Sequence, residues 1–181
     1  FKNGLGAPPT HYFYNNDAAL VEAALAYNRL GKNVYHGCAV YKTSQSRKGE
    51  NAAAVKSLWV DLDVGSNKTY KTPRDAVAAL EKFRRTVGLE QPHYVSSGFG
   101  IHAYFPFTVP VDTTSWSKLA AIFASCLDVA GVAHDGSRTH DIASILRVPG
   151  TNNYKNGTPR SVKLLAAGTA EAPDQILKKL K

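Results

Sequence analysis

The sequence predicts an α+β protein in which a mixed or antiparallel sheet is packed by helices. Its 181 residues are 44% hydrophobic, which is enough for one domain with a real core. Strand-like and helix-like stretches alternate without the regular βαβ rhythm of a parallel sheet. Residues 93 to 109 resemble two strands joined by a glycine-containing turn, which is the pattern of an antiparallel hairpin.

The N-terminal third predicts a loop, a helix and a strand. Residues 1 to 16 contain Gly, Pro and Asn and predict a loop or a short edge segment. A helix is expected to start at Asp17, an N-cap candidate, and to end before Gly31, because apolar residues recur at helical spacing between them. Residues 33 to 41 alternate and are rich in β-forming residues, so they predict a strand, and residues 42 to 51 form a polar, basic loop.

The middle of the chain predicts a helix followed by the hairpin. Pro73 marks a helix start, and the apolar pattern that follows it closes at Gly88. Residues 93 to 97 predict a short strand, Gly98-Phe99-Gly100 a turn, and residues 101 to 109 the returning strand.

The C-terminal part predicts two helices with short elements between them. The first helix opens at Thr113 or Thr114 and runs to about Ala130. A helical turn is expected near residues 142 to 145, with strand pieces at 146 to 148 and 161 to 165. Residues 172 to 181 predict a basic amphipathic helix.

The charge predicts a polyanionic partner. There are 22 Lys and Arg against 14 Asp and Glu, a formal net charge of +8 that is spread along the chain. Such a field attracts nucleic acid, nucleotides or an acidic membrane surface. A basic protein that is merely soluble remains the alternative.

The number of cysteines, the apolar runs and the absence of Met predict where the protein is found and how the chain is organised. Cys38 and Cys126 are too few for a disulfide framework or a four-ligand zinc site, which favours a reducing, intracellular location in the cytoplasm. No apolar run approaches the roughly 20 residues that span a bilayer. The chain has no Met, even at position 1, so we expect a single domain, residues 1 to 181, cut from a longer protein.

The stretch Ser57 to Asp63 carries the first chemical signal. Apolar, strand-forming residues are interrupted by Asp61 and Asp63, which a strand would place on one face with Cα atoms roughly 6.6 Å apart. Two carboxylates that close repel each other unless a positive charge lies between them. A bound Mg²⁺ or Mn²⁺ would explain the pair, because hard cations prefer oxygen ligands. A strand end whose Asp residues cap the next turn is the alternative.

The stretch Ser96 to Tyr104 carries the second signal. Its Gly98-x-Gly100 pattern superficially matches a dinucleotide fingerprint, but the following residues are strand-like, so a Rossmann site is rejected. Small residues in a turn let backbone N–H groups approach an anion, and Ser96 and Ser97 add hydroxyl donors. His102 follows on the strand and is either a functional or a structural histidine.

The third signal combines acidic residues with a basic segment. Asp135 and Asp141 could each complete a carboxylate cluster, and Arg147, Asn153 and Lys155 could bind triphosphate oxygens. The alternative is that both Asp residues cap turns and that the basic segment is an ordinary surface turn.

Together, these three blocks resemble the archaeo-eukaryotic primase superfamily, in particular the primase-polymerase domains of phages, plasmids and other mobile elements. The resemblance rests on Val60-Asp61-Leu62-Asp63, on Ser96 to His102, and on an Asp followed by the Leu-Arg-Val-Pro-Gly-Thr-x-Asn-x-Lys segment that ends at Lys155. It covers the chain from about Val34 to Leu165 and implies an RRM-like catalytic core. His134 stands where the family usually has an apolar residue before its third ligand.

The resemblance implies template-directed nucleotidyl transfer from dNTPs or NTPs on a single-stranded or primed DNA template. Asp61, Asp63 and Asp135 would hold two Mg²⁺ or Mn²⁺ ions, about 4 Å apart. The nucleotide-binding residues that it implies are Ser96, Ser97, Gly100, His102, Arg147, Asn153 and Lys155. His102 would contact the triphosphate and counts among the catalytic residues. No zinc is expected, and a helicase or template-binding domain would belong to the longer chain.

Three other functions remain open at this point. A metal-dependent phosphohydrolase could use the His134-Asp135 and His140-Asp141 pairs, although such sites need further histidine ligands. A non-catalytic nucleic-acid-binding module would explain the charge and the aromatic residues but not Asp61 and Asp63. A repair or end-joining polymerase of the same superfamily would share the chemistry and differ in its partners.

Overall fold

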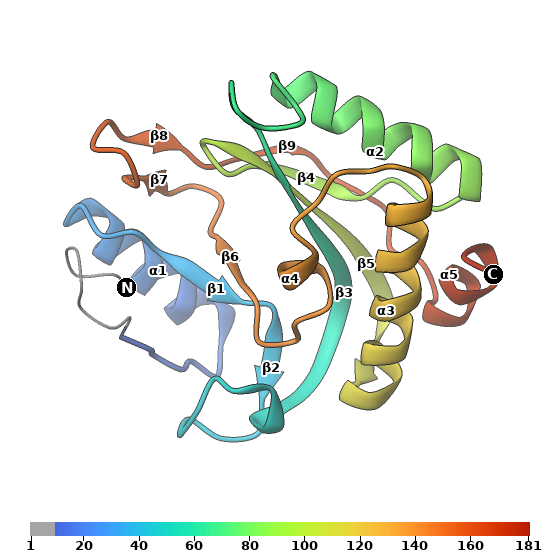
Figure 1. Ribbon diagram of the computed structural model, residues 1–181. Coiled ribbons are helices and arrows are strands. Elements are labelled where there is room, and N and C mark those ends of the chain that lie inside the picture. The colour runs from blue at the N-terminus through green and yellow to red at the C-terminus, as the bar shows by residue number, and fades with distance from the viewer. Residues whose placement is uncertain (1–9) are drawn as a thin grey trace.

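A five-stranded antiparallel sheet runs through the middle of the molecule (Figure 1). The computed structural model describes residues 10 to 181. In spatial order the strands are β2 (Ala39–Tyr41), β3 (Ala52–Asp63), β5 (Gly100–Asp112), β4 (His93–Ser96) and β9 (Lys163–Ala166). Every neighbouring pair is antiparallel, which confirms the predicted α+β class.

Three helices cover one side of this sheet: α2 (Pro73–Val87), α3 (Thr113–Val129) and α5 (Pro173–Lys179) (Figure 1). The β3 side chains Leu58, Val60 and Leu62 are completely buried in the core. On β5, Phe105 packs against Phe123 of α3 with ring centroids 5.2 Å apart. The apolar faces of the helices therefore bury one face of the sheet, as the helical spacing in the sequence predicts.

A second layer lies on the other side of the sheet (Figure 1). It contains a helix, two short two-stranded sheets and a single helical turn. These elements are α1 (Asp17–Arg29), β1 (Tyr35–Gly37) paired with β6 (Ile145–Arg147), β7 (Asn152–Asn153) paired with β8 (Arg160–Ser161), and α4 (Gly136–Thr139). A 3₁₀ turn, η1 (Gly49–Asn51), precedes β3.

Asparagine side chains hold this second layer together. The side chain of Asn28 on α1 donates to the backbone oxygen of Asn152 at 2.8 Å and accepts from its N–H at 2.7 Å. Asn33 accepts a hydrogen bond from the N–H of Tyr154 at 2.9 Å. Segments more than 100 residues apart in the sequence are thus fixed to each other by paired amides, which leaves the buried backbone groups satisfied.

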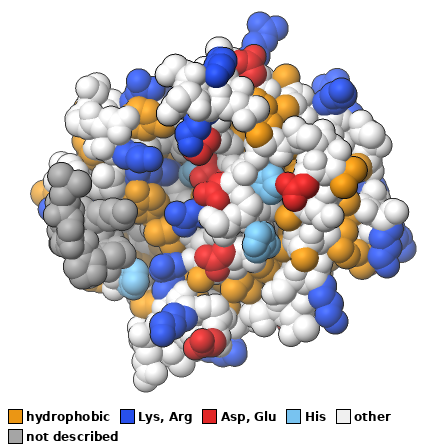
Figure 2. All heavy atoms as spheres, viewed as in Figure 1, with side chains coloured by type: hydrophobic (Ala, Val, Ile, Leu, Met, Phe, Trp, Pro, Cys, Tyr) orange, Lys and Arg blue, Asp and Glu red, His pale blue; other side chains and the backbone are white. Residues whose placement is uncertain are grey.

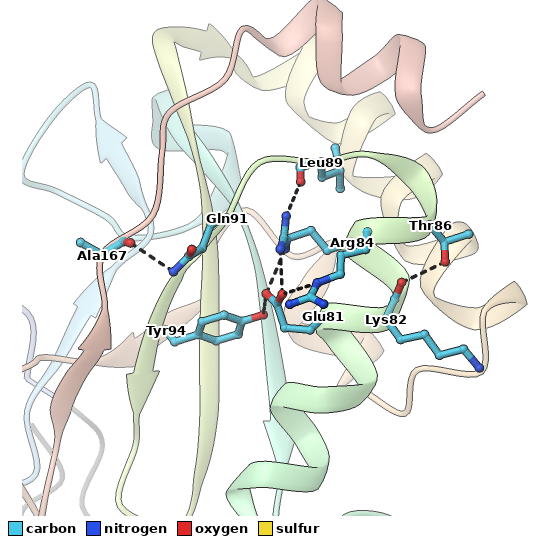
Figure 3. A network of polar contacts seen from close by, with 9 residues as sticks. Glu81, Lys82, Arg84, Thr86, Leu89, Gln91, Tyr94 and Ala167 are labelled. Carbon is cyan, nitrogen blue, oxygen red and sulfur yellow. Dashed lines mark hydrogen bonds and ion pairs between the residues drawn. The ribbon is translucent and has the colours of Figure 1, made fainter.

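A polar network fixes α2 to the sheet (Figure 3). Glu81 accepts two hydrogen bonds from Arg84, at 2.9 and 2.7 Å, and one from the buried Tyr94 hydroxyl of β4 at 2.8 Å. The bond with Arg84 lowers the pKa of Glu81, while burial raises the pKa of Tyr94 far above its usual value. Arg84 also donates to the Leu89 carbonyl oxygen at 2.9 Å, so the same residues set the entry into β4.

Two stacked indoles join the sheet to α3 and α4. Trp59 of β3 and Trp116 of α3 are both completely buried, with ring centroids 4.7 Å apart. The Trp59 ring N–H donates to the Arg138 carbonyl oxygen at 2.7 Å, and the Trp116 ring N–H donates to the Ser57 carbonyl oxygen at 2.9 Å. Because both indole N–H groups donate hydrogen bonds, the pair buries apolar surface without leaving a buried donor unpaired.

The predicted helices are confirmed with small changes at their ends. The side chain of Asn16, rather than Asp17, caps α1 by accepting from the Ala19 N–H at 2.8 Å. The predicted helices from Pro73 to Gly88 and from Thr113 to about Ala130 correspond to α2 and α3. Residues 10 to 16 form an irregular segment as predicted, and residues 1 to 9 of that prediction lie outside the described part of the chain.

Two predicted strands are each divided in the structure. The stretch 33 to 41 breaks at Cys38, whose N–H donates to the Ser144 carbonyl oxygen, so its halves β1 and β2 belong to different sheets. The stretch 161 to 165 breaks at Val162, whose N–H and carbonyl bond to Thr151 and Gly150 instead of to a strand. Alternation in the sequence indicates an extended chain but not the partner of each half.

The predicted helical turn near residues 142 to 145 is wrong. The helix lies earlier, at Gly136–Thr139, and residues 142 and 143 form a turn that the Asp141 side chain stabilises by accepting from the Ala143 N–H at 2.9 Å. The sequence Gly-Ser-Arg-Thr has no apolar period, so a pattern-based prediction overlooks it. No helix within residues 10 to 181 is long and apolar enough to cross a membrane.

Candidate active site

Asp61, Asp63 and His102 lie on one face of the sheet, at the end of β3. The register places Asp61 opposite His102 and Asp63 opposite Gly100. Directly opposed residues of antiparallel strands share a face, and so do residues two apart on one strand. The sequence prediction that the two carboxylates share a face therefore agrees with the register.

Gly100 allows the two strands to approach at this point. A Cβ atom added to it would lie 2.7 Å from the Leu62 carbonyl oxygen, a backbone atom that cannot turn away. We expect Gly100→Ala to lower the free energy of unfolding by about 1–3 kcal/mol, because the strands would have to move apart. Urea unfolding measures this. Gly136→Ala is the control, since its Cβ would meet only His134 Nε2 at 3.9 Å, and an equal loss in both variants would contradict the explanation.

Asp135 joins the two aspartates of β3 from the second layer. Its N–H donates to the Asp61 carbonyl oxygen at 2.9 Å, which holds the start of α4 against β3. Its carboxylate accepts from the Ser137 hydroxyl at 2.6 Å and lies 3.7 Å from Arg138 Nε. The structure thus brings together three carboxylates that are separated by up to 74 positions in the sequence (135 − 61).

The electrostatics of Asp61 reflect this crowding. Burial raises the pKa of Asp61 to about 7, and the negative charges of Asp63 and then Asp135 add to the rise. Arg138 and Lys155 act in the opposite direction. Asp63 is more exposed and pairs with Lys68 at 2.7 Å. An acidic group with a raised pKa beside two further carboxylates is typical of a functional site.

His102 is neutral at the edge of this cluster. Its side chain is only 5% exposed, and its Nε2 atom lies 3.7 Å from Asp61 Oδ1, too far for a hydrogen bond. Burial, with smaller contributions from His36, Arg147 and Arg138, lowers its pKa to about 3. Within residues 10 to 181, His102 Nδ1 is buried and has no hydrogen-bond partner. Most buried polar atoms are paired, so this one is an exception, and it is the Nε2 atom that faces the carboxylates.

The turn before His102 is held in place by Asn153. The Asn153 amide donates to the Ser97 carbonyl oxygen at 2.7 Å and accepts from the Lys155 N–H at 3.0 Å. Both Ser97 and Asn153 are buried, whereas Lys155 is exposed and acts on the pKa of Asp61. The amide of Asn153 is therefore engaged within the protein, and Lys155 is the member of this group that is free to reach an anion.

Arg147 is also engaged within the protein. Its guanidinium donates to Asn33 Oδ1 at 2.5 Å and lies 4.2 Å from the centroid of the Tyr35 ring. Only 5% of the residue is exposed, and burial lowers its pKa. Its positive charge still acts on His102 and helps to lower the pKa of that side chain.

Asp141, the alternative third carboxylate, lies elsewhere. It is exposed, accepts from the Ala143 N–H, and is not among the groups that change the pKa of Asp61. Two basic residues that the sequence analysis did not select, Lys68 and Arg138, contact the carboxylates instead. Arg138 stands three residues after Asp135, a helical spacing that could have revealed it.

The cluster has the chemistry of a divalent-cation site but not a preformed geometry. Among the side chains of residues 10 to 181, no three His, Cys, Asp or Glu converge closely enough to hold a metal ion as they stand. The donors of Asp61, Asp63 and Asp135 are all carboxylate oxygens, which suit Mg²⁺ or Mn²⁺. Burial is the main cause of the raised pKa of Asp61, and the repulsion by Asp63 and Asp135 that adds to it is what a cation would relieve. The residues therefore fit a hard cation, with Lys68 and Ser137 as the partners it would replace.

Figure 2 shows the same face in atomic detail. Acidic side chains lie along the middle of the face, and Lys and Arg side chains lie beside them. Of the basic residues near the carboxylates, Lys68 and Lys155 are exposed and Arg138 is partly exposed. A negatively charged ligand could therefore be held next to the carboxylates, provided that cations offset their charge.

Comparison with known proteins decides the fold. No family model and no curated protein matches the chain. The AEP domain of the primase-polymerase of cyanophage S-2L superposes with a TM-score of 0.61 at 20% identity, over 92% of this chain and 77% of that one. The chain has the fold of an archaeo-eukaryotic primase (AEP) domain. The predicted primase-like architecture is thereby confirmed.

A second solved structure is more distant. The polymerase domain of ligase D from Mycobacterium tuberculosis, solved in complex with DNA, matches with a TM-score of 0.45 and 16% identity, over 81% of this chain and 57% of that one. Within the AEP fold of this chain, the carboxylates lie where the second layer, through α4, meets the end of β3.

Proposed function

We propose that this protein is a template-directed nucleotidyltransferase, a DNA primase-polymerase that extends a 3′-hydroxyl and releases pyrophosphate. The observation that supports it best is the meeting of Asp61, Asp63 and Asp135 beside His102 on an AEP fold. A fold alone does not define an activity, so the proposal depends on these side chains. Neither a structural ion pair nor a strand cap would require three carboxylates at one place.

In this proposal the three carboxylates hold two Mg²⁺ or Mn²⁺ ions. Ions held there would supply the chemistry of lowering the pKa of the attacking 3′-hydroxyl and of offsetting the charge of the triphosphate and the leaving pyrophosphate. Asp61 is held rigidly by the sheet register and by the Asp135 N–H. Asp63 and Asp135 are more exposed and lie on the solvent side, where substrate would enter.

The nucleotide is bound by groups around the turn of residues 96 to 100. His102 offers the Nε2 atom that lies beside Asp61, Lys155 offers its exposed ammonium, and Ser96 and the Gly100 backbone add neutral donors. Ser97, Asn153 and Arg147 support these groups: Asn153 fixes the turn, and Arg147 contributes positive charge from a buried position. Fixed donors aimed at a developing negative charge are an effective source of transition-state stabilisation.

The remaining features of the proposal concern partners. The +8 net charge would bind single-stranded or primed DNA through its phosphates, with either dNTPs or NTPs as substrates. The biological setting would be replication of a phage, plasmid or other mobile element, inside the cell, with a helicase or template-binding domain in a longer chain.

Incorporation of a labelled nucleotide on a primed template, with and without Mn²⁺, tests the activity directly. Mn²⁺-dependent extension by one or more nucleotides is the expected result. Binding of DNA without extension would favour a nucleic-acid-binding module instead. The phosphohydrolase alternative has less support in the structure, because Asp135 acts on the pKa of Asp61 whereas Asp141, the aspartate of its second pair, does not.

His102 should affect nucleotide binding more than DNA binding. Loss of one hydrogen bond to a charged phosphate costs roughly 1.5–3 kcal/mol, so His102→Ala should weaken nucleotide affinity about 10- to 150-fold. Calorimetry with nucleotide and Mn²⁺ measures this, and anisotropy with labelled DNA gives the second affinity. If the variant loses DNA binding but keeps full nucleotide affinity, the histidine lies in the DNA channel and its assignment to the nucleotide is wrong.

A further inference from the structure

A large cavity lies on the same side of the sheet as the carboxylates but is lined by other residues. Its volume is about 950 Å³, it is open to solvent on one side, and it is lined by residues 10 to 15, the start of α1, strands β1 and β2, and parts of β3 and β5. This volume is at the upper end of the range for small-molecule pockets. Arg138, which pairs with Asp135, also lines the cavity and so connects it to the candidate active site.

Aromatic rings from several segments line this cavity. They are Tyr12, Phe13, Tyr14, Tyr35, Tyr41 and Tyr104. Tyr14 is 39% exposed, so its ring is accessible to a ligand, whereas Tyr12 is 49% exposed but stacks on Tyr27 with ring centroids 5.3 Å apart. Phe13 contacts the edge of the Tyr41 ring, with centroids 5.7 Å apart, and the Tyr41 hydroxyl is buried without a hydrogen-bond partner in the described part of the chain.

The charged residues of the cavity are mostly basic. Lys42, Arg47, Lys56 and Arg138 line it, against one acidic residue among the described lining side chains, Asp17. The cations come from the loop after β2, from β3 and from α4, so they are spread along the cavity rather than gathered at one point. Lys42 and Arg47 donate to the carbonyl oxygens of Glu50 and Ala143, and Arg138 lies beside Asp135, so they contribute positive charge mainly from fixed positions, whereas Lys56 is exposed. Spread charges of this kind suit a ligand with several separate negative groups.

We propose that this cavity binds the unpaired bases of a single-stranded polynucleotide, the template strand, and this inference rests on the proposed function. Proteins that bind single strands combine a positively charged groove along the backbone with aromatic rings on which bases stack. A duplex hides the faces of its bases and cannot use the rings. A single nucleotide would fill only part of the cavity and would reach only some of the cations.

The position of the cavity indicates from which side the strand would approach the carboxylates. Lys56 and Ser57 of β3 line the cavity, and Asp61 follows on the same strand. Tyr104 and His36 also line the cavity and are joined by a contact of 3.1 Å between the Tyr104 hydroxyl and His36 Nε2, and Tyr104 lies two residues from His102 on β5. The unpaired template would therefore approach the site from the start of β3, past this pair and Arg138.

Binding of labelled oligonucleotides in EDTA tests the proposal without metal or catalysis. The probes are oligo-dT, oligo-U and a DNA hairpin duplex, measured by anisotropy with the whole chain. Tyr14→Ala should weaken binding of single strands about 5- to 150-fold, the loss expected for one stacked base. Tyr14→Phe, which keeps the ring, should bind within about 2-fold of the unchanged protein.

A second pair of variants tests the contribution of positive charge by comparing two exposed lysines. Lys56→Gln should reduce the salt dependence of single-strand binding by about 0.7 in the log–log slope, the value for one phosphate contact. Lys118→Gln, on α3 across the sheet, is the matched control and should change nothing. Tighter binding of oligo-dT than of oligo-U would identify the strand as DNA, and the reverse order would identify it as RNA; both outcomes support a single-strand site.

Three results would overturn the proposal. One is unchanged single-strand binding by both Tyr14→Ala and Lys56→Gln. Another is an equal loss for the duplex, which would indicate a general basic surface. The third is loss of thymidine monophosphate binding with oligonucleotide binding intact, which would indicate a mononucleotide pocket. Primer extension by the unchanged protein separates this from the proposed function: single-strand binding that depends on Tyr14 in an unchanged protein that never extends a primer would support the cavity and reject the polymerase.

Discussion

Asp61→Asn is expected to reduce nucleotide incorporation by at least about 1000-fold while the protein stays folded. The substitution keeps the size of the side chain but removes the charge at the centre of the carboxylate cluster. Metal ions contribute several kcal/mol of charge stabilisation in such reactions, and about 4 kcal/mol corresponds to a factor of 1000. Primer extension at saturating Mn²⁺ measures the rate, and circular dichroism checks the fold.

The two other aspartates make this experiment specific. Asp135→Asn should match Asp61→Asn, because the structure holds Asp135 against Asp61. Asp141→Asn should retain full activity, since Asp141 is exposed and an Asn side chain can still accept the Ala143 N–H. Near-normal extension by Asp61→Asn would contradict the proposal that this carboxylate cluster carries out nucleotidyl transfer. Loss of activity in Asp141→Asn but not in Asp135→Asn would show that the third metal ligand is Asp141, six residues further along the chain.

The same substitution should stabilise the metal-free protein at alkaline pH. The pKa of Asp61 rises from 3.8 to about 7 on folding, so the folded state holds this proton more tightly than the unfolded chain. The resulting contribution to stability is complete below about pH 4 and is lost as the pH rises to 7. An ionised carboxylate with this pKa costs up to about 4 kcal/mol, and because 22% of the side chain is exposed we expect about 2–3 kcal/mol.

Urea unfolding in EDTA at pH 5 and pH 8 measures this difference. Asp61→Asn should be about 2–3 kcal/mol more stable than the unchanged protein at pH 8, with a smaller advantage at pH 5. Mn²⁺ should raise the stability of the unchanged protein and have less effect on the variant, because a ligand stabilises the state that binds it. A variant less stable than the unchanged protein at pH 8 would show that the Asp61 charge is already compensated without metal.

Features with a local cause could be predicted from the sequence. The helix from Pro73 to Gly88 has a capping box at one end, where Thr72 and Asp75 bond reciprocally, and a left-handed glycine at the other. The strand at Asp61 and Asp63 and the hairpin that carries His102 likewise depend on alternation and on a glycine turn. Patterns of this kind act over a few residues, so they are visible without knowledge of the tertiary structure.

Features that depend on distant partners could not be predicted in this way. The break at Cys38 exists because residues 35 to 37 pair with β6, more than 100 residues away. Arg147 and Asn153 fit a triphosphate motif by type, but their actual partners are Asn33 and Ser97. The pairing of Lys68 with Asp63 depends on how the loop after β3 turns back. Residue type and spacing thus indicate candidate site residues, and the tertiary structure decides which of their polar groups are already bonded within the protein.

The stacked tryptophans give this protein an internal optical reporter. Trp59 and Trp116 are the two tryptophans of the chain, and both are buried. One indole N–H bonds to the backbone of Arg138, in the helix that follows Asp135. Intrinsic fluorescence excited at the indole band therefore originates at the junction between β3, α3 and α4. A shift in its emission when cations or nucleotides are added would register movement of α4 without any attached dye.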